Sequence, residues 1–549
     1  FNPFTTDINA VRGQETGYAT LNPLDSSNTA GSTTFSDGNL KAAFPSDSGT
    51  GQTAASIYVS SGKWYCEFYL ESTNDLTSCQ YGLVSPGSKR AAYIGASGTG
   101  DQYGWEPEID RAYTGGTNTT PTGKTFTSQW SVAAMALDLD NGTWEMFIDG
   151  IPTGTIYSNI SGTYTFAIGD SMSSGYHTHT ANFGQKPFKF PPPAGFQPLN
   201  AANARPVKVF ARPDQYFDTK MWNGNGSSQT ISGLKFSPGL VWIKKRNNNP
   251  DEWHGITDTV RGVTKTLYPN ETHQESTEAG GLTAFNADGF SVGNWQGNNH
   301  SSGTYIAWCW KAGGAAVSNT DGTITSSVSA NQTHGFSICT FTGTGANTSV
   351  GHGLNTIPQF VMAKTRTKTD GWPVYHSGGG SNYQLFINQT DAGASGTSYF
   401  NGAPTNSVVN LGNNSGSNQS GQPCLLYCWH DVPGLQKFGS YVGNGDNDGA
   451  YIELGFAPKI LLTKSSSHGS DWQLWDTSRQ PYNVNANTLT PNSDAAETGT
   501  AGYAVDMLSN GVKFRMYGSS SNQSGYTYVY AAWAEAPTFN LYGAQSNAR

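Results

Sequence analysis

Short stretches of alternating or continuous apolar residues, separated by turns rich in Gly, Ser and Asn, run along the whole chain. Residues 62–71 alternate bulky apolar and polar side chains, which is the two-residue period of a half-buried strand. Residues 132–150 predict two strands joined at Asp140-Asn141-Gly142, because Asn-Gly favours the positive φ angles of a tight hairpin. Residues 163–170 predict another strand. This pattern indicates an all-β protein.

The chain after residue 200 repeats one pattern three times. Each repeat opens with Pro, continues with an apolar strand and reaches Lys six residues after the Pro; a Trp follows the Lys by eight or nine residues. Each repeat closes on an aromatic strand whose last Trp lies 72, 71 or 75 residues after the Pro. The opening Pro and closing Trp are Pro238 and Trp310, Pro358 and Trp429, and Pro458 and Trp533.

Two hypotheses account for the recurring Lys and Trp residues, which are Lys244, Trp253, Lys364, Trp372, Lys464 and Trp472. Exposed aromatic faces mark binding surfaces, so these residues could form a glycan-binding site. Repeats preserve core residues most readily, so the same residues could be anchors of the repeat core. We favour the core role.

The first and third repeats share two further motifs, Asp-Thr-x-Arg at 258–261 and 476–479 and Leu-x-Pro-Asn at 267–270 and 489–492. The second repeat lacks both motifs and has a Gly-rich stretch at 377–380 instead. The second repeat is therefore expected to differ from the other two at this place.

Composition and charge narrow the class of protein. The 549 residues include 67 Gly, 13% charged and 12% aromatic residues, which excludes helical bundles and plain disorder. The net charge is −9, and residues 244–246 form the one Lys/Arg cluster, so we predict no nucleic-acid partner. No run of eighteen apolar residues occurs, so we predict no membrane insertion.

Catalytic motifs are absent from the sequence. It contains no nucleophile elbow in a strand–turn–helix context, no phosphate loop and no His-Glu-x-x-His. The acids Glu106, Glu108 and Asp110 alternate along one segment, but nothing assigns them as a glycosidase pair. We therefore predict a protein that is not an enzyme and uses no cofactor.

No metal site is predicted either. His177 and His179 share one face of a strand, but no third ligand is evident, so surface histidines are favoured. Cys66 and Cys79 lie on neighbouring predicted strands, where two free core thiols are favoured over a disulfide. The acidic residues of the 132–150 hairpin are expected on its solvated face rather than around calcium.

The N-terminal third resembles the SPRY domain family. The matching stretches are residues 62–71 (GKWYCEFYLE), 136–150 (ALDLDNGTWEMFIDG) and 182–196 (NFGQKPFKFPPPAGF). The resemblance covers about residues 23–200. It implies a bent β-sandwich of two sheets that binds partners through its loops and carries no catalytic residues.

The repeated anchors resemble an uncharacterised domain found in virion proteins of marine bacteriophages, often downstream of a SPRY domain. The resemblance spans about residues 207–537. It implies a phage particle protein, either a tail fibre or a knob or spike on the capsid. The expected organisation is an N-terminal arm (1–22), a SPRY-like sandwich (23–200), and three homologous β-rich domains, here called segment 1 (201–312), segment 2 (313–435) and segment 3 (436–549).

Three functions remain open. The leading hypothesis is a non-enzymatic structural protein on the virion surface that recognises the host surface or decorates the shell. Its expected partners are other virion proteins and a host cell-surface glycan or protein, and a homo-oligomer, most plausibly a trimer, is expected. The alternatives are a glycan-degrading tailspike and a secreted bacterial adhesin or filament subunit.

Overall fold

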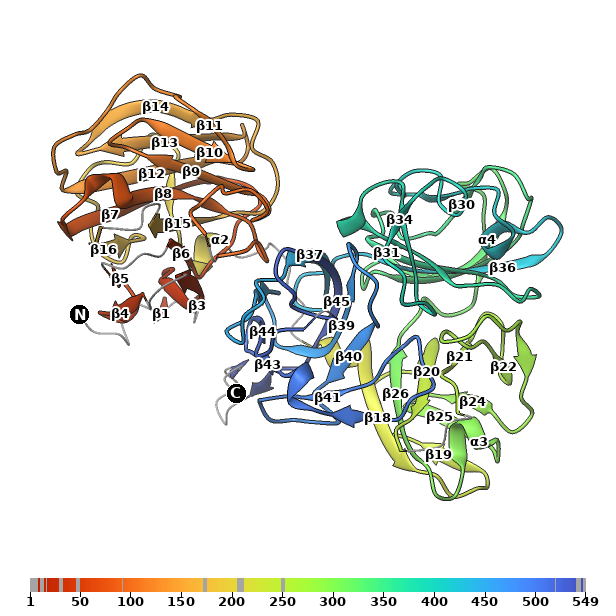
Figure 1. The fold of residues 1–549 in the computed structure, drawn as a ribbon. Coiled ribbons are helices and arrows are strands. Elements are labelled where there is room, and N and C mark those ends of the chain that lie inside the picture. The colour runs from red at the N-terminus through yellow and green to blue at the C-terminus, as the bar shows by residue number, and fades with distance from the viewer. Residues whose placement is uncertain are drawn as a thin grey trace. The chain divides into compact units, whose positions relative to one another are not determined.

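The computed structural model describes residues 8–9, 14–15, 17–28, 33–45, 50–90, 92–170, 175–204, 212–247, 252–518, 520–539 and 545–546. Its internal contacts divide the chain into two compact units (Figure 1). Unit 1 holds residues 1–207 and 450–453, and unit 2 holds residues 208–449 and 454–549. Most of the predicted N-terminal arm, 1–22, lies outside the described residues.

Unit 1 is built from two antiparallel sheets. The first has the order β11-β10-β9-β8-β15-β6-β3, with bounds β3 (Leu21–Asn28), β6 (Gly51–Ala55), β8 (Cys79–Val84), β9 (Gln102–Glu106), β10 (Arg111–Thr114), β11 (Thr117–Thr119) and β15 (Thr165–Asp170). The second has the order β14-β13-β12-β7-β16-β5-β4, with bounds β4 (Thr34–Ser36), β5 (Lys41–Phe44), β7 (Lys63–Thr73), β12 (Val132–Asp138), β13 (Thr143–Ile148), β14 (Ile151–Tyr157) and β16 (His177–Asn182). β17 (Gln197–Pro198) pairs in parallel with β7. The smaller elements of this unit are β1 (Ile8–Asn9), β2 (Gln14–Glu15), η1 (Leu76–Ser78) and α2 (Ala201–Ala204).

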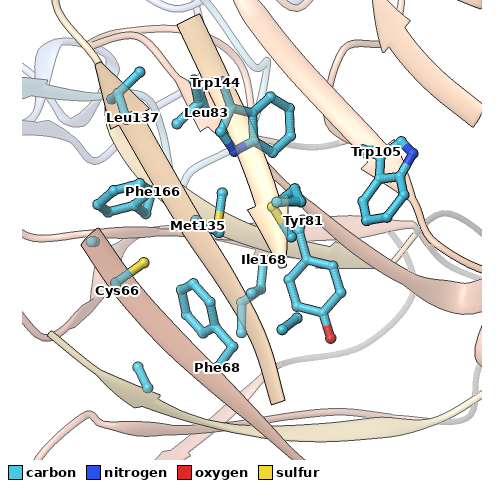
Figure 2. Packing of buried hydrophobic residues seen from close by; sticks show 14 of the residues in the cluster. Cys66, Phe68, Tyr81, Leu83, Trp105, Met135, Leu137, Trp144, Phe166 and Ile168 are labelled. Carbon is cyan, nitrogen blue, oxygen red and sulfur yellow. The ribbon is translucent and has the colours of Figure 1, made fainter. Parts of the chain in front are cut away.

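The core of unit 1 lies between the two sheets. Figure 2 shows Phe68, Tyr81, Met135 and Trp144 among the packed side chains, which come from both sheets. The predicted hairpin is present, because β12 and β13 pair from Ala133↔Ile148 to Asp138↔Thr143 with the Asn-Gly turn at their tip. Every second side chain along these strands points into this core, so the two-residue period of apolar residues in the sequence supplies the buried face of each sheet.

Unit 2 contains three central sheets with one strand order. Segment 1 has β18-β26-β20-β21, segment 2 has β29-β36-β31-β32, and segment 3 has β37-β45-β39-β40. Their bounds are β18 (Phe217–Asn223), β20 (Leu240–Lys245), β21 (Gly255–Asp258), β26 (Thr304–Trp310), β29 (Phe336–Thr342), β31 (Phe360–Thr365), β32 (Pro373–His376), β36 (Pro423–Trp429), β37 (Gln436–Val442), β39 (Pro458–Ser465), β40 (Gln473–Asp476) and β45 (Thr527–Ala534). The aromatic closing strands β26, β36 and β45 are flanked on both sides, and this explains their continuous apolar sequences.

Short strands and single helical turns surround these sheets. In segment 2 the central sheet is extended by β27 (Val317–Asn319), β28 (Ser326–Asn331), β33 (Tyr383–Phe386) and β34 (Ala394–Ser395). The remaining strands of unit 2 are β19 (Gln229–Ile231), β22 (Lys265–Thr266), β23 (Ser276–Thr277), β24 (Leu282–Asn286), β25 (Gly289–Val292), β30 (Thr348–Gly351), β35 (Val408–Leu411), β41 (Asn487–Thr488), β42 (Thr498–Gly499), β43 (Val505–Met507), β44 (Gly511–Phe514), β46 (Thr538–Phe539) and β47 (Gln545–Ser546). Strand β38 (Tyr451–Glu453) belongs to unit 1. The helical turns are η2 (Pro213–Gln215), α3 (Gln296–Asn299), η3 (Ser377–Gly379), α4 (Ser415–Asn418) and η4 (Ala501–Tyr503). Within the described residues, no helix has the length and apolar character needed to cross a bilayer.

The closing tryptophans of the three segments meet in one cluster. Trp310, Trp429 and Trp533 contact one another edge to face, with ring centroids 5.9, 5.4 and 6.1 Å apart. Edge-to-face packing is favoured because the positive edge of one ring meets the negative face of the next. A cavity of about 10 Å³ beside them is lined by aromatic and aliphatic side chains of all three segments. One hydrophobic core therefore joins all three segments.

Candidate functional site

The three recurring lysines lie in the interfaces between segments, and all three are buried. Each ammonium group donates a hydrogen bond to a backbone carbonyl of another segment, in the pairs Lys364–Thr272 (3.0 Å), Lys464–Thr390 (3.1 Å) and Lys244–Asp494 (2.8 Å). Segment 2 thus binds segment 1, segment 3 binds segment 2, and segment 1 binds segment 3. The contacts close a cycle within one chain.

The recurring tryptophans make a second contact of the same cyclic kind. The indole N–H of Trp372 donates to the Tyr268 carbonyl of segment 1 at 2.9 Å. The indole N–H of Trp472 donates to the Phe386 carbonyl of segment 2 at 2.8 Å. Both rings are buried, so neither offers a face for stacking on a sugar.

In segment 1 the corresponding position is His254, one residue after Trp253. Its Nε2–H donates to the Thr490 carbonyl of segment 3 at 3.3 Å, and its Nδ1 accepts from the Trp242 indole at 2.9 Å. Trp253 itself is half-buried and stacks on His273, with centroids 4.7 Å apart. In segment 1, the spacing from Lys244 therefore identifies Trp253, whereas its neighbour His254 makes the contact with segment 3.

An asparagine side chain defines this correspondence independently. The backbone N–H groups of His254, Trp372 and Trp472 each donate to an asparagine Oδ1 of their own segment, namely Asn270 (2.9 Å), Asn388 (2.9 Å) and Asn492 (2.8 Å). The carbonyl that accepts from the ring of the neighbouring segment lies two residues before this Asn, and the carbonyl that accepts from Lys lies two residues after it. Segment 2 therefore keeps the Leu and the Asn of the Leu-x-Pro-Asn motif, at Leu385 and Asn388, and replaces the Pro by Ile387.

Burial sets the protonation of the three lysines. It lowers the pKa of Lys244, Lys364 and Lys464 to about 8, because the charged ammonium loses water on burial. Their acceptors are backbone carbonyls, which compensate the charge less than a carboxylate would. Nearby acids, including Asp494 beside Lys244, oppose this effect.

Ion pairs reinforce two of the three interfaces. Between segments 1 and 2, Glu275 accepts from Arg261 at 2.9 Å and from Arg366 at 2.7 and 2.9 Å. Arg261 is fixed in turn by Asp258 at 2.5 Å, the acid of the Asp-Thr-x-Arg motif. The Asp-Thr-x-Arg motif therefore positions Arg261, one of the two arginines that bind Glu275 in the bridge between segments 1 and 2.

The interface between segments 3 and 1 repeats this arrangement. Glu497 of segment 3 accepts from Arg246 of segment 1 at 2.7 and 3.2 Å, and Arg479 lies 3.5 Å from the same carboxylate. Asp476 binds Arg479 at 2.5 Å, as Asp258 binds Arg261. The two segments that share the motif thus use it in the same way.

The interface between segments 2 and 3 uses different contacts. His376 takes the place of the motif's Asp and donates from Nε2 to the Tyr530 carbonyl at 2.9 Å. The Gly-rich stretch follows at once, and a Cβ on Gly378 would lie 3.0 Å from the Ser440 Cβ and 3.3 Å from the Gly439 backbone. Glycine is used here because the two segments approach closely.

A second set of buried residues escaped sequence reasoning. Asn299, Asn418 and Asn522 are buried, and each Nδ2 donates to carbonyls of the surrounding loops, those of Gly293, Gly412 and Met516 among them. Each Asn stands eleven residues before the closing Trp of its segment. That constant spacing was the signal that could have identified them.

An open cleft of about 960 Å³ lies between segments 1 and 2, and its size is typical of ligand sites. Ser237, Thr259, Asn331, Gln332 and the backbone of 312–316 contribute polar groups, beside apolar Pro238, Val260 and Ala330. Among the described residues that line it, Lys311 is the one ionisable side chain. This mixture suits a neutral, hydroxyl-rich ligand or a weakly acidic one.

An aromatic platform stands beside this cleft. The Lys311 ammonium lies 5.3 Å from the centre of the Tyr216 ring, and Tyr216 stacks on His334. Tyr216 and His334 are both half-buried. The recurring Lys and Trp residues do not line this cleft.

Two of the three acids that alternate in unit 1 accept local hydrogen bonds, whereas the Glu108 Oε2 atom is buried without a hydrogen-bond partner among the described residues. Asp110 accepts from the Trp105 indole at 3.0 Å and from the Gly123 N–H at 2.6 Å. Glu106 accepts from the Tyr113 hydroxyl at 2.9 Å. In the hairpin, Asp138 is buried rather than solvated, and its carboxylate accepts from the Asn141 N–H at 3.0 Å.

The prediction of surface histidines is wrong. His177 and His179 are fully buried, because β16 lies inside the second sheet and its alternate residues face the core. Cys66 and Cys79 are both free and buried.

Comparison with known proteins covers both units. The sequence model of a family described as "Domain of unknown function (DUF7483)" matches residues 212–537. The chain belongs to this DUF7483 family. The DUF7483 match includes the central sheets of all three segments and both sides of every interface described above.

Three solved structures are each similar to about 30% of this chain. The SPRY domain of human HERC1 is 17% identical, covers 30% of this chain and 99% of its own, and has a TM-score of 0.26. The TRIM65 PSpry domain is 15% identical, with 30% and 92% covered and a TM-score of 0.23. The carbohydrate-binding module CBM66 from Bacillus subtilis is 9% identical, with 29% and 95% covered and a TM-score of 0.21. The predicted fold class, all-β with an N-terminal SPRY-like β-sandwich, is confirmed.

Proposed function

We propose that the protein is a non-enzymatic structural protein of a bacteriophage particle, exposed on the virion surface as a tail fibre or as a capsid knob or spike. The observation that carries the proposal is the location of the recurring Lys and Trp side chains. The sequence repeats Lys and Trp at constant spacing, and the three lysines together with Trp372 and Trp472 join segments to one another instead of lining a cleft. Side chains that hold segments together are expected in a rigid structural protein, so these contacts support the proposal.

We also propose that segments 1, 2 and 3 are three copies of one duplicated unit. The same strand order in the three central sheets supports it. The equivalent Asn270, Asn388 and Asn492 contacts support it further, because unrelated β-domains would not share side-chain acceptors at matching positions. The resemblance of the repeated anchors to virion proteins of marine phages is the basis for the particle assignment.

Within that role, the cleft beside Lys311 is the proposed attachment point for a host cell-surface glycan. Its polar lining can hydrogen-bond to hydroxyl groups. Glycoside hydrolysis needs two carboxyl groups about 5–10 Å apart across the bond. A lining whose ionisable side chain is a lysine favours binding over the alternative of a glycan-degrading tailspike.

Two measurements test the proposal. Gradient-purified particles of a phage that encodes this chain should contain the protein by mass spectrometry, and an antibody against it should label intact tails or capsids in negative-stain images. A chain absent from purified particles would overturn the virion assignment, and secretion by a bacterium without particles would favour an adhesin. Reducing-sugar release from host polysaccharide would instead establish the degrading tailspike.

The oligomeric state and binding are tested on the purified chain. We expect a homo-oligomer, with a trimer favoured, in sedimentation analysis. A glycan array should show binding that Lys311→Ala weakens at least tenfold while Lys265→Ala, outside the cleft, leaves it unchanged. Equal binding by both variants would remove the cleft from the proposal without affecting the virion assignment.

A further inference from the structure

Three potential metal ligands converge inside unit 1. Cys79 lies at the start of β8 in the first sheet, and His177 and His179 lie on β16 in the second sheet. Their ligand atoms, the Cys79 Sγ and one ring nitrogen of each histidine, all lie within 4.8 Å of one another. All three side chains are fully buried. The missing third ligand of the His-x-His pair is thus a cysteine about 100 residues earlier, supplied by the opposite sheet.

Burying the two imidazole rings costs free energy that apolar side chains at the same positions would not cost. Both ring nitrogens of His177 and both of His179 lack a hydrogen-bond partner among the described residues. Leaving a buried polar group unpaired costs about 1–3 kcal/mol. Their rings pack against aromatic neighbours, His177 on Phe44 at 4.5 Å and His179 on Tyr81 at 5.5 Å, which a phenylalanine could do equally well. A role that uses the nitrogen lone pairs accounts for histidine at both positions.

We propose that Cys79, His177 and His179 bind one Zn²⁺ ion between the two sheets of the N-terminal sandwich. Thiolate and imidazole are the ligands that zinc prefers, and sites with Cys and His donors occur in its structural and catalytic centres. Ligands at about 2.0–2.3 Å from tetrahedral zinc lie about 3.5 Å apart. A side-chain adjustment of about 1 Å would close the observed spacing to this geometry.

Zinc binds the thiolate form of cysteine, so metal binding would release the proton of the Cys79 thiol.

Acidic groups near the cluster offset the charge of the ion. Asp170, fully buried, is the Cα partner of Cys79 in the β8–β15 pairing, so its side chain projects to the same face of the sheet. Asp75 and Glu108 also act electrostatically on the thiol, and Glu71 acts on His179. A zinc ion with one thiolate ligand keeps one positive charge, which this acidic surrounding stabilises.

The site has a structural consequence. Zinc bound by these three residues would link β8 of one sheet directly to β16 of the other, at a place where the two sheets are otherwise held by side-chain packing. Structural zinc contributes its binding free energy to folding. The sandwich should therefore unfold at a lower temperature when zinc is removed.

Metal analysis of the full chain tests this inference and does not depend on the proposed function. Protein produced with added zinc should carry about one zinc per chain, and a strong chelator should lower the melting temperature of unit 1. After exchange into Co²⁺ under reducing conditions, the spectrum should show a thiolate-to-cobalt charge-transfer band. These measurements on the wild type need no variant to fold.

Variants assign the ligands. Cys79→Ala should abolish the thiolate band, and His177→Phe, which keeps the stacking on Phe44, should weaken zinc binding at least tenfold. Cys66→Ala is the matched control, because Cys66 is also a free, buried thiol of this sandwich but lies outside the cluster. Wild-type protein that takes up neither zinc nor cobalt would overturn the inference. So would a thiolate band that persists in Cys79→Ala, or uptake of copper alone.

Discussion

The Lys364 ammonium group lies 3.0 Å from the Thr272 carbonyl oxygen of the preceding segment. The same ammonium also donates to the Lys368 and Asp370 carbonyls of its own segment. One buried cation thus joins two loops of different segments through backbone oxygens.

We expect Lys364→Met to lower the free energy of unfolding by about 1–3 kcal/mol, because it leaves three carbonyls of half-buried residues without this donor. Urea unfolding followed by tryptophan fluorescence measures the change. Lys235→Met is the control, since that side chain is 52% exposed, and it should stay within about 0.5 kcal/mol of wild type. A Lys364→Met chain as stable as wild type would show that the contact contributes nothing.

The buried lysines predict an unusual pH dependence. Burial lowers the pKa of Lys364 from 10.5 to about 8, so between these values the folded chain binds fewer protons than the unfolded chain. Stability from this group therefore rises with pH across that window. Unfolding of wild type and Lys364→Met at pH values from about 7 to about 10 should show the difference growing by about 1 kcal/mol per pH unit above pH 8. A difference that stays constant or shrinks would contradict this.

The bridge at Glu275 predicts a second rise of stability with pH, this time in the acidic range. Burial alone would raise the pKa of Glu275, but hydrogen bonds to Arg366 and Arg261 and their charges outweigh it, so the pKa is lowered from 4.5. The resulting stabilisation is complete above about pH 4.5 and is lost as the pH falls through the lowered pKa.

Glu275→Gln should therefore destabilise the chain near neutral pH by about 3 kcal/mol, because it leaves the buried Arg261 without one of its acidic partners. The difference from wild type should fade below about pH 4. Glu271→Gln, whose side chain is 33% exposed, is the control and should have little effect. An equal loss in both variants, or a difference that persists in acid, would argue against the bridge.

Segment 1 predicts a compensating pair of substitutions. Trp242 and His254 occupy the positions that Met362 and Trp372 hold in segment 2, so the indole lies on β20 in segment 1 and directly before β32 in segment 2. His254→Trp alone should overpack the interface and cost about 1–3 kcal/mol. Adding Trp242→Leu should recover most of that loss. Simple additivity in this double-mutant cycle would mean that the two positions do not share one space.

Local periodicity in the sequence determined the fold class and the strands. Residues 62–71 and 132–150 alternate because each strand has one face in the sandwich core, and this signal needs no knowledge of distant residues. The spacing from Pro to Lys and closing Trp located β20, β31 and β39 and their partners correctly for the same reason, since each motif spans one strand and its turn.

Tertiary structure alone decided what those residues touch. Trp253 and His254 are neighbours in the chain, and only strand pairing shows that His254 carries the contact to Thr490, 236 residues away. Likewise His177 and His179 share a strand face that the sequence predicts, whereas Cys79 joins them because the two sheets stack. A one-residue step along a strand reverses the side-chain direction, and approach between sheets depends on the whole fold, so neither follows from local pattern.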